Sequence, residues 1–194
     1  MAVSNVVFPV FPFLPLIRNV LCKRLPIRLV VFDADKTLWD NPNASSLELP
    51  FKRVGEDSLV DARGNRLNLF SGIRELLQVL RSEGIVLALA TWNKPEQIKE
   101  ALRILELEPF FRYVAAEFHP RKHLLLRKIL KNLSDEGTHL KPEEILYVDD
   151  RDIHLKDIRK TVGRVAFLQM WKDVTHPNEI LSYVKNTNLK NPSG

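Results

Sequence analysis

Cysteine is nearly absent from this chain of 194 residues, in which Cys22 is the only one. A single cysteine excludes an intrachain disulfide scaffold and any zinc site that needs several thiolates. Long apolar runs are missing as well, because no stretch has the roughly 18–20 uninterrupted apolar residues of a membrane-spanning helix. We therefore expect no membrane partner and a cytoplasmic location.

A strong excess of charge of one sign is also missing, because 29 Lys and Arg residues stand against 24 Asp and Glu residues. The net charge of +5 suits anionic partners in general and selects none, so nucleic acid stays open as a partner without being indicated. Apolar residues make up 45% of the chain and charged residues 27%, a balance that excludes disorder. The length predicts a single domain.

The first 26 residues differ from the remainder, since an apolar stretch there carries Pro9, Pro12 and Pro15 at a period of three. Proline inside a helix costs about 3 kcal/mol, so we expect an extended segment. A secretory signal is disfavoured because no Lys or Arg precedes the apolar stretch. A flexible extension, a strand at the domain edge and an upstream start codon remain alternatives. We divide the chain into an extension (residues 1–26), a domain (27–187) and a flexible tail (188–194).

Strand-like and helix-like segments alternate along the predicted domain. Short apolar runs predict buried strands at residues 28–32, 85–90, 113–116, 145–148 and 165–169. Helical spacing of apolar residues predicts helices at 71–83, 95–105 and 121–133, with shorter ones near 158 and at 178–183. For the first helix, Ser71 is the expected N-cap and Gly84 the expected stop. A hairpin is expected around Gly64 and Asn65. The alternation predicts an α/β fold, with a mainly parallel sheet between two layers of helices.

Polar side chains follow the predicted strands at the points where these strands end. They are Asp33, Asp35 and Thr37 after the first strand, Thr91, Trp92 and Asn93 after the second, Lys122 after the third, and Asp149 and Asp150 after the fourth. Ligands bind at this edge of a parallel sheet, so we expect the groups to share one site. One carboxylate can attack an electrophile while a second one moves a proton. Clustered acids need a cation, and oxygen ligands favour Mg²⁺. The pattern predicts a phosphoryl-transfer site.

Four segments carry a family resemblance. VVFDADKTL resembles the first motif of the haloacid dehalogenase superfamily of phosphohydrolases, ALATWN the second and LYVDD the fourth, while Lys122 takes the place of the third. More narrowly, FDADKTLWD, DARGNRLNLFSGIRELL, EFHPRKH and VDDRD are similar to the magnesium-dependent phosphatase-1 subfamily. The resemblance covers about residues 28–170. It implies a Rossmann-like three-layer fold and a Mg²⁺-dependent phosphomonoester hydrolase.

The resemblance also implies roles for single residues. Asp33 would be the nucleophile and a metal ligand, and Asp35 the general acid and base, with its backbone carbonyl on the metal. Thr91 and Lys122 would bind the phosphoryl group. Helix capping is the alternative for Thr91, and Arg121 and Lys128 are rival basic residues for Lys122.

In the fourth motif, Asp150 would bind the metal directly, with Asp149 behind it. Many relatives carry Asn or Asp where this chain has His154, a poor Mg²⁺ ligand, so Asp152 or a water would supply that oxygen. Trp39, Trp92, Asn93 and His119 are candidates for contact with the substrate. Thr37 is expected to stabilise the turn.

The spacing of the motifs leaves room for a hairpin flap and no room for a helical cap domain. We therefore expect an open site that accepts phosphorylated small molecules or macromolecules, or that a second subunit closes. A polynucleotide-end or nucleotide phosphatase of the same chemistry is the alternative, and a non-catalytic binding module is disfavoured because both Asp33 and Asp35 are present.

Overall fold

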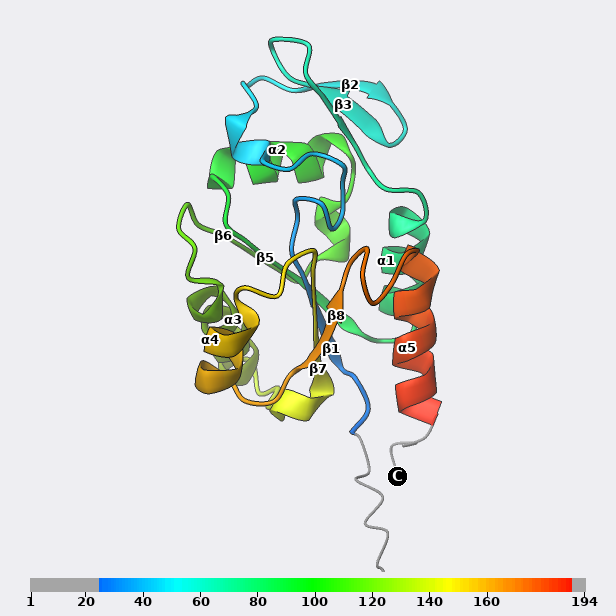
Figure 1. Cartoon of the computed structure of the whole chain (residues 1–194), viewed down its shortest axis with the longest axis vertical. Helices are drawn as coiled ribbons and strands as arrows, with labels where there is room; N and C mark the ends of the chain where they lie inside the picture. Colours follow the sequence, from blue (N-terminus) through cyan, green and yellow to red (C-terminus); the bar gives the residue numbers. More distant parts are fainter. Residues whose placement is uncertain (1–24, 190–194) are drawn as a thin grey trace, which may run out of the picture.

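The computed structural model describes residues 25–189, and its centre is a parallel sheet of five strands in the order β6-β5-β1-β7-β8 (Figure 1). The strands are β1 (Leu29–Phe32), β5 (Val86–Thr91), β6 (Tyr113–Ala116), β7 (Ile145–Asp149) and β8 (Ala166–Gln169). All four neighbouring pairs run parallel. The predicted parallel α/β fold is confirmed, and the carboxyl ends of all five strands meet at one edge of the sheet.

Helices cover both faces of this sheet. They are α1 (Ile73–Ser82), α2 (Pro95–Ile104), α3 (Lys122–Asp135), α4 (Leu155–Thr161) and α5 (Pro177–Leu189), with short 3-10 turns at Ala44–Ser46, Glu108–Phe110 and Pro142–Glu144. Alternate residues of β1 enter two separate cores, as the period of two requires. Val30 and Phe32 pack with α1, α2 and α5, whereas Leu29 and Val31 pack with α3 and α4. In Figure 1, α3 and α4 lie on one side of the strands, and α1 and α5 on the other.

A small antiparallel sheet between β1 and α1 replaces a cap domain. Its strands are β2 (Lys52–Gly55), β3 (Ser58–Val60) and β4 (Arg66–Asn68), in the order β2-β3-β4. The turn between β3 and β4 is built on Asp61, whose carboxylate accepts the backbone N–H groups of Glu48, Arg63 and Asn65. The side-chain amide of Asn65, together with these N–H groups, lowers the pKa of Asp61 to about 2. The expected hairpin is confirmed, with one additional strand.

The predicted start of the first helix is wrong by two residues. Ser71 is not its N-cap, because the helix begins after Gly72, which has a left-handed φ of +85° and makes no side-chain cap. The Phe70 N–H donates to the Leu38 carbonyl (2.9 Å), so the chain stays attached to the β1 loop up to residue 70 and turns only afterwards. Gly84 ends the helix as expected, with a φ of +76°.

The two ends of the described chain are joined to each other. The Asn188 side chain accepts the Ile27 N–H (2.7 Å) and donates to the Ile27 carbonyl (3.2 Å). Helix α5 therefore runs to Leu189, two residues past the predicted boundary of the domain. The proline-containing segment and Cys22 lie outside the described residues. Within residues 25–189, no helix is long and apolar enough to cross a membrane.

Gly163 should be the least replaceable glycine of the described fold. It has a φ of +117°, and an added Cβ would lie 2.5 Å from Cγ of Pro142. Gly84 also has a positive φ, yet its Cβ would meet nothing within 4 Å. We expect Gly84→Ala to lower the free energy of unfolding by about 1 kcal/mol, and Gly163→Ala by about 3 kcal/mol because overpacking adds to the backbone cost. Urea unfolding measures both values, and equal losses would contradict this account.

Candidate active site

The loop after β1 turns back on itself directly behind the strand. The Asp33 N–H donates to the Val148 carbonyl (2.9 Å), which holds Asp33 against the end of β7. Lys36 then adopts a left-handed φ of +55°, and the Leu38 N–H donates to the Ala34 carbonyl (2.8 Å). This turn places Asp33 and Asp35 at the carboxyl edge of the sheet. The Thr37 hydroxyl has no hydrogen-bond partner among the described residues, so only the backbone of Thr37 supports the turn.

A buried lysine joins the ends of β1 and β7. Lys122 is 1% exposed, and its Nζ lies 2.7 Å from Oδ1 of Asp33 and 2.6 Å from Oδ2 of Asp149. Burial alone would lower the pKa of Lys122, but the two carboxylates raise it on balance, so the ammonium stays charged. Of the three basic residues considered, only Lys122 contacts these acids, because Arg121 is exposed and Lys128 is paired with Glu117 on the surface.

Three carboxylates form a group that fits a divalent metal ion. Asp33, Asp149 and Asp150 each offer an oxygen, and these oxygens lie within 4.8 Å of one another. Both Asp149 oxygens are already engaged, Oδ2 by Lys122 and by the Tyr147 hydroxyl, and Oδ1 by the Arg151 N–H (2.9 Å). Asp33 and Asp150 are therefore the residues that would hold Mg²⁺, with Asp149 fixing their surroundings. An all-oxygen set of this kind suits Mg²⁺.

The two candidate ligands hold their protons more tightly than ordinary carboxyls do. Burial raises the pKa of Asp33 to about 7, and this effect outweighs the opposite influence of the Lys122 ammonium. Burial and the charge of Asp149 raise the pKa of Asp150 to about 6. A cation at this position would balance the negative charge of ionised Asp33 and Asp150, for which the Lys122 ammonium alone is not sufficient.

Asp35 is held by a network of donors from three parts of the chain. Its Oδ1 accepts the indole N–H of Trp39 (2.9 Å), and its Oδ2 accepts the side-chain amide of Asn93 (2.8 Å). The backbone N–H of Ala44 lies 3.2 Å from Oδ1 and 3.3 Å from Oδ2. The amide nitrogen of Asn93 is also 2.9 Å from the hydroxyl oxygen of Thr91, so the second strand end is joined to the first. The network fixes the direction in which Asp35 faces the site.

The four residues named as substrate contacts lie in different surroundings. Trp92 is 39% exposed beside Thr91 and remains open to a ligand. Asn93 and Trp39 are buried, and their polar atoms bind Asp35 rather than face solvent. His119 is paired with Glu117 (2.7 Å). Thr91 does not cap the following helix, whose N-cap is Lys94 without a side-chain cap bond.

His154, which the family resemblance marked as a departure, does not belong to the group of Asp33, Asp149 and Asp150 that fits a metal ion. Its side chain is buried at the start of α4, and its Nε2 has no hydrogen-bond partner among the described residues. Burial lowers the pKa of His154, so the ring is neutral.

Two residues of the site were not predicted from the sequence. Tyr147, whose hydroxyl donates to Asp149, lies two residues earlier in β7 and thus on the same face of the strand. A tyrosine in an otherwise aliphatic strand was the available signal. The Ser45 hydroxyl donates to Asn93 (2.5 Å) and accepts the Lys94 N–H (2.8 Å). No sequence pattern marks Ser45, because the loop that carries it has no periodicity.

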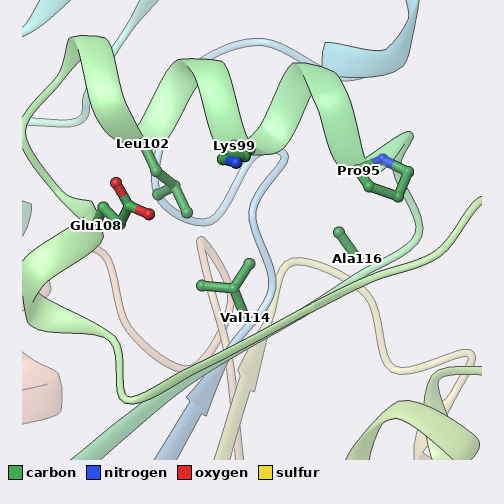
Figure 2. Close-up of a pocket in the computed structure, with 6 residues that line it drawn as sticks. All are labelled: Pro95, Lys99, Leu102, Glu108, Val114 and Ala116. Atoms are coloured by element: carbon green, nitrogen blue, oxygen red, sulfur yellow. The ribbon is translucent and has the colours of Figure 1, made fainter.

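A cavity of about 260 Å³ lies between the edge strand β6 and helix α2 (Figure 2). Figure 2 shows Val114 and Ala116 of β6 on one side and α2 on the other. Its lining residues are Pro95, Lys99, Leu102, Glu108, Val114 and Ala116. None of them is a candidate catalytic or metal-binding residue, so we place the chemistry at the carboxyl edge of the central strands.

Comparisons with known proteins agree with this geometry. The model of the Acid Phosphatase family matches residues 24–167. The chain is 30% identical over 138 residues to Magnesium-dependent phosphatase 1 of Homo sapiens, an alignment that covers 71% of this chain and 74% of that protein. It is 29% identical over 171 residues to a HAD-like hydrolase superfamily protein of Schizosaccharomyces pombe, covering 82% of this chain and 93% of that protein.

A solved structure has the same fold. It is the N-terminal part of the protein BF1531 from Bacteroides fragilis, which contains a phosphatase domain and was crystallised with Mg. The TM-score is 0.56 at 17% identity, over 87% of this chain and 41% of that one, so the present chain spans less than half of the length of the crystallised chain. Taken together, the family match and the relatives establish that the chain belongs to the Acid Phosphatase family, as a haloacid dehalogenase-type phosphatase similar to magnesium-dependent phosphatase-1.

Proposed function

We propose that this chain hydrolyses phosphomonoesters in a Mg²⁺-dependent reaction that passes through an aspartyl-phosphate on Asp33. The observation that carries the proposal is the buried contact of Lys122 with Asp33 and Asp149, with Asp150 beside them. An incoming phosphate dianion requires positive charge around the attacking acid, which the Lys122 ammonium and a cation held by Asp33 and Asp150 would supply.

In the first step, Oδ2 of Asp33 would attack the phosphorus atom. Oδ1 is bonded to Lys122, whereas Oδ2 makes no hydrogen bond within residues 25–189. The bond from phosphorus to the leaving oxygen breaks, and that oxygen takes its proton from Asp35. In the second step Asp35 removes a proton from a water molecule, and the water oxygen attacks phosphorus. The bond between phosphorus and Asp33 then breaks, which releases phosphate and regenerates the Asp33 carboxylate.

The remaining groups would hold the phosphoryl oxygens. Thr91 lies fully buried at the end of β5, and its hydroxyl oxygen accepts from Asn93, which leaves the hydroxyl proton for a phosphate oxygen. Lys122 stays charged and offsets the charge that gathers on phosphate and Asp33. Bound Mg²⁺ would supply further positive charge at the same oxygens.

The substrate is a phosphorylated molecule, and the absence of a helical cap from residues 25–189 suits small and macromolecular esters alike. Exposed apolar side chains follow the strands on both sides of β1, namely Trp92, Phe118 and Ile153. A leaving group longer than the phosphate itself would contact this rim. A cytoplasmic location and closure of the site by a second subunit stay predictions.

Metal removal should abolish activity reversibly, and the Mg²⁺ requirement should depend on pH. Protons and Mg²⁺ compete for Asp33 and Asp150, whose pKa values are raised to about 7 and about 6. We therefore expect the Mg²⁺ concentration for half-maximal activity to rise as the pH falls from about 7.5 to about 5.5. Titration of EDTA-treated enzyme with Mg²⁺ at both pH values measures this. Full activity in EDTA, or a requirement that falls with falling pH, would contradict the proposal.

A further inference from the structure

Trp171, two residues after the edge strand β8, contacts the loop after β1 although no motif marks it. Its indole N–H donates to the Lys36 carbonyl at 2.7 Å, across 135 residues of sequence. Lys36 is the residue after Asp35 and has a left-handed φ of +55°. The indole N–H therefore binds the carbonyl of Lys36, and the left-handed conformation of Lys36 turns the chain after Asp35.

The backbone of Trp171 is itself in a left-handed conformation, with a φ of +68°. This conformation is rare for a large side chain, and it persists only where the surrounding structure holds it in place. The indole ring packs on Phe70 (4.4 Å between ring centroids), yet it remains 44% exposed. The same loop is anchored to the end of β7, because the Met170 N–H donates to the Asp149 carbonyl (2.9 Å).

We propose that Trp171 is a positioning residue that keeps Asp35 aimed for proton transfer. The indole N–H holds the Lys36 carbonyl, and this bond supports the left-handed turn. This turn places the backbone of Asp35 where its carboxylate meets the donors of Trp39, Ala44 and Asn93. This inference rests on the proposed role of Asp35 as general acid. Loss of the indole N–H should impair proton delivery while Asp33 and Lys122 remain in place.

A comparison of substrates whose leaving groups differ in basicity distinguishes a role of Trp171 in proton transfer from a purely structural role. An alkyl oxygen needs a proton as it departs, whereas an aryl oxygen such as p-nitrophenolate leaves without one. For Trp171→Phe, which keeps a ring against Phe70, we expect kcat/KM to fall about tenfold for an alkyl phosphate and less than about threefold for p-nitrophenyl phosphate. Trp171→Gly, which relieves the left-handed strain, should show the same selective loss.

Phe70→Leu is the matched control, because it reduces ring packing and keeps the indole N–H. We expect it to lower the melting temperature without changing the ratio of alkyl to aryl kcat/KM. Equal losses on both substrates for the Trp171 variants, unchanged activity, or a selective loss in Phe70→Leu would each overturn the inference. Asp35→Asn is assayed in parallel. If Asp35→Asn shows no preference for aryl phosphate, the proposed role of Asp35 fails. If Asp35→Asn shows that preference and the Trp171 variants do not, the inference alone fails.

Discussion

Replacement of Asp33 by asparagine should abolish turnover, with kcat lowered by roughly 10⁴-fold or more. The amide keeps the shape of the side chain but offers no anionic oxygen to attack phosphorus, and it removes one of the two carboxylates that would hold Mg²⁺. The steady-state hydrolysis of p-nitrophenyl phosphate measures the effect, and far-UV circular dichroism establishes that the variant is folded.

The control is Asp157→Asn, which changes an exposed acid on α4 outside the metal-binding group. We expect its kcat to stay within about twofold of the wild-type value, because solvent and salt screen the charge of an exposed side chain outside the site. An Asp33→Asn variant that retained a tenth of the wild-type activity would show that another group attacks phosphorus.

Replacement of Lys122 by methionine should weaken both stability and catalysis. Asp33 and Asp149 would remain buried without their counter-charge, so we expect the free energy of unfolding in EDTA to fall by about 3 kcal/mol. Without the ammonium, the already raised pKa of Asp33 would rise further, and the pKa of Asp149, which Lys122 helps to lower, would rise as well. Stability is then lost as the pH increases, so the deficit should be larger at about pH 8 than at about pH 5. We expect kcat to fall by roughly 10²-fold.

Lys128→Met is the matched control on the same helix. Lys128 also pairs with a carboxylate, at 3.0 Å from Glu117, but its side chain is 60% exposed. Exposed ion pairs contribute about 0–1 kcal/mol, so this variant should unfold nearly as the wild type does. Urea unfolding of both variants in EDTA at the two pH values makes the comparison. Equal stability losses, or a Lys122 deficit that shrinks as the pH rises, would contradict the account.

The sheet and the meeting of the strand ends were predictable because they depend on patterns that the sequence carries locally. Apolar runs fix the strands, and parallel topology then brings the residues after β1, β5 and β7 to one edge. The prediction of Lys122 as the basic residue of the site needed more than the spacing of the motifs, because Lys128 lies on the same helix. Its identification came from the family resemblance, and the structure adds the reason, which is that Lys122 is buried at the first turn of α3.

The contacts around Asp35 were not predictable, because they join irregular segments far apart in the sequence. Asn93 was expected to face the substrate, but the loop at Ser45 folds over it and the amide faces Asp35. Trp171 lies 135 residues from Lys36, and neither residue belongs to a periodic pattern. The prediction of Ser71 as the helix N-cap was wrong for a similar reason, because the preceding residue, Phe70, donates its N–H to the Leu38 carbonyl in the loop after β1.

The most direct test of the account is to locate the phosphoryl group during turnover. Rapid acid quenching of the Mg²⁺-loaded enzyme with substrate, followed by borohydride reduction, converts an aspartyl-phosphate to homoserine, which peptide mass spectrometry assigns to one residue. We predict homoserine at position 33 in the wild type and none in Asp33→Asn. Homoserine at another aspartate, or its absence during confirmed turnover, would contradict the proposed covalent mechanism.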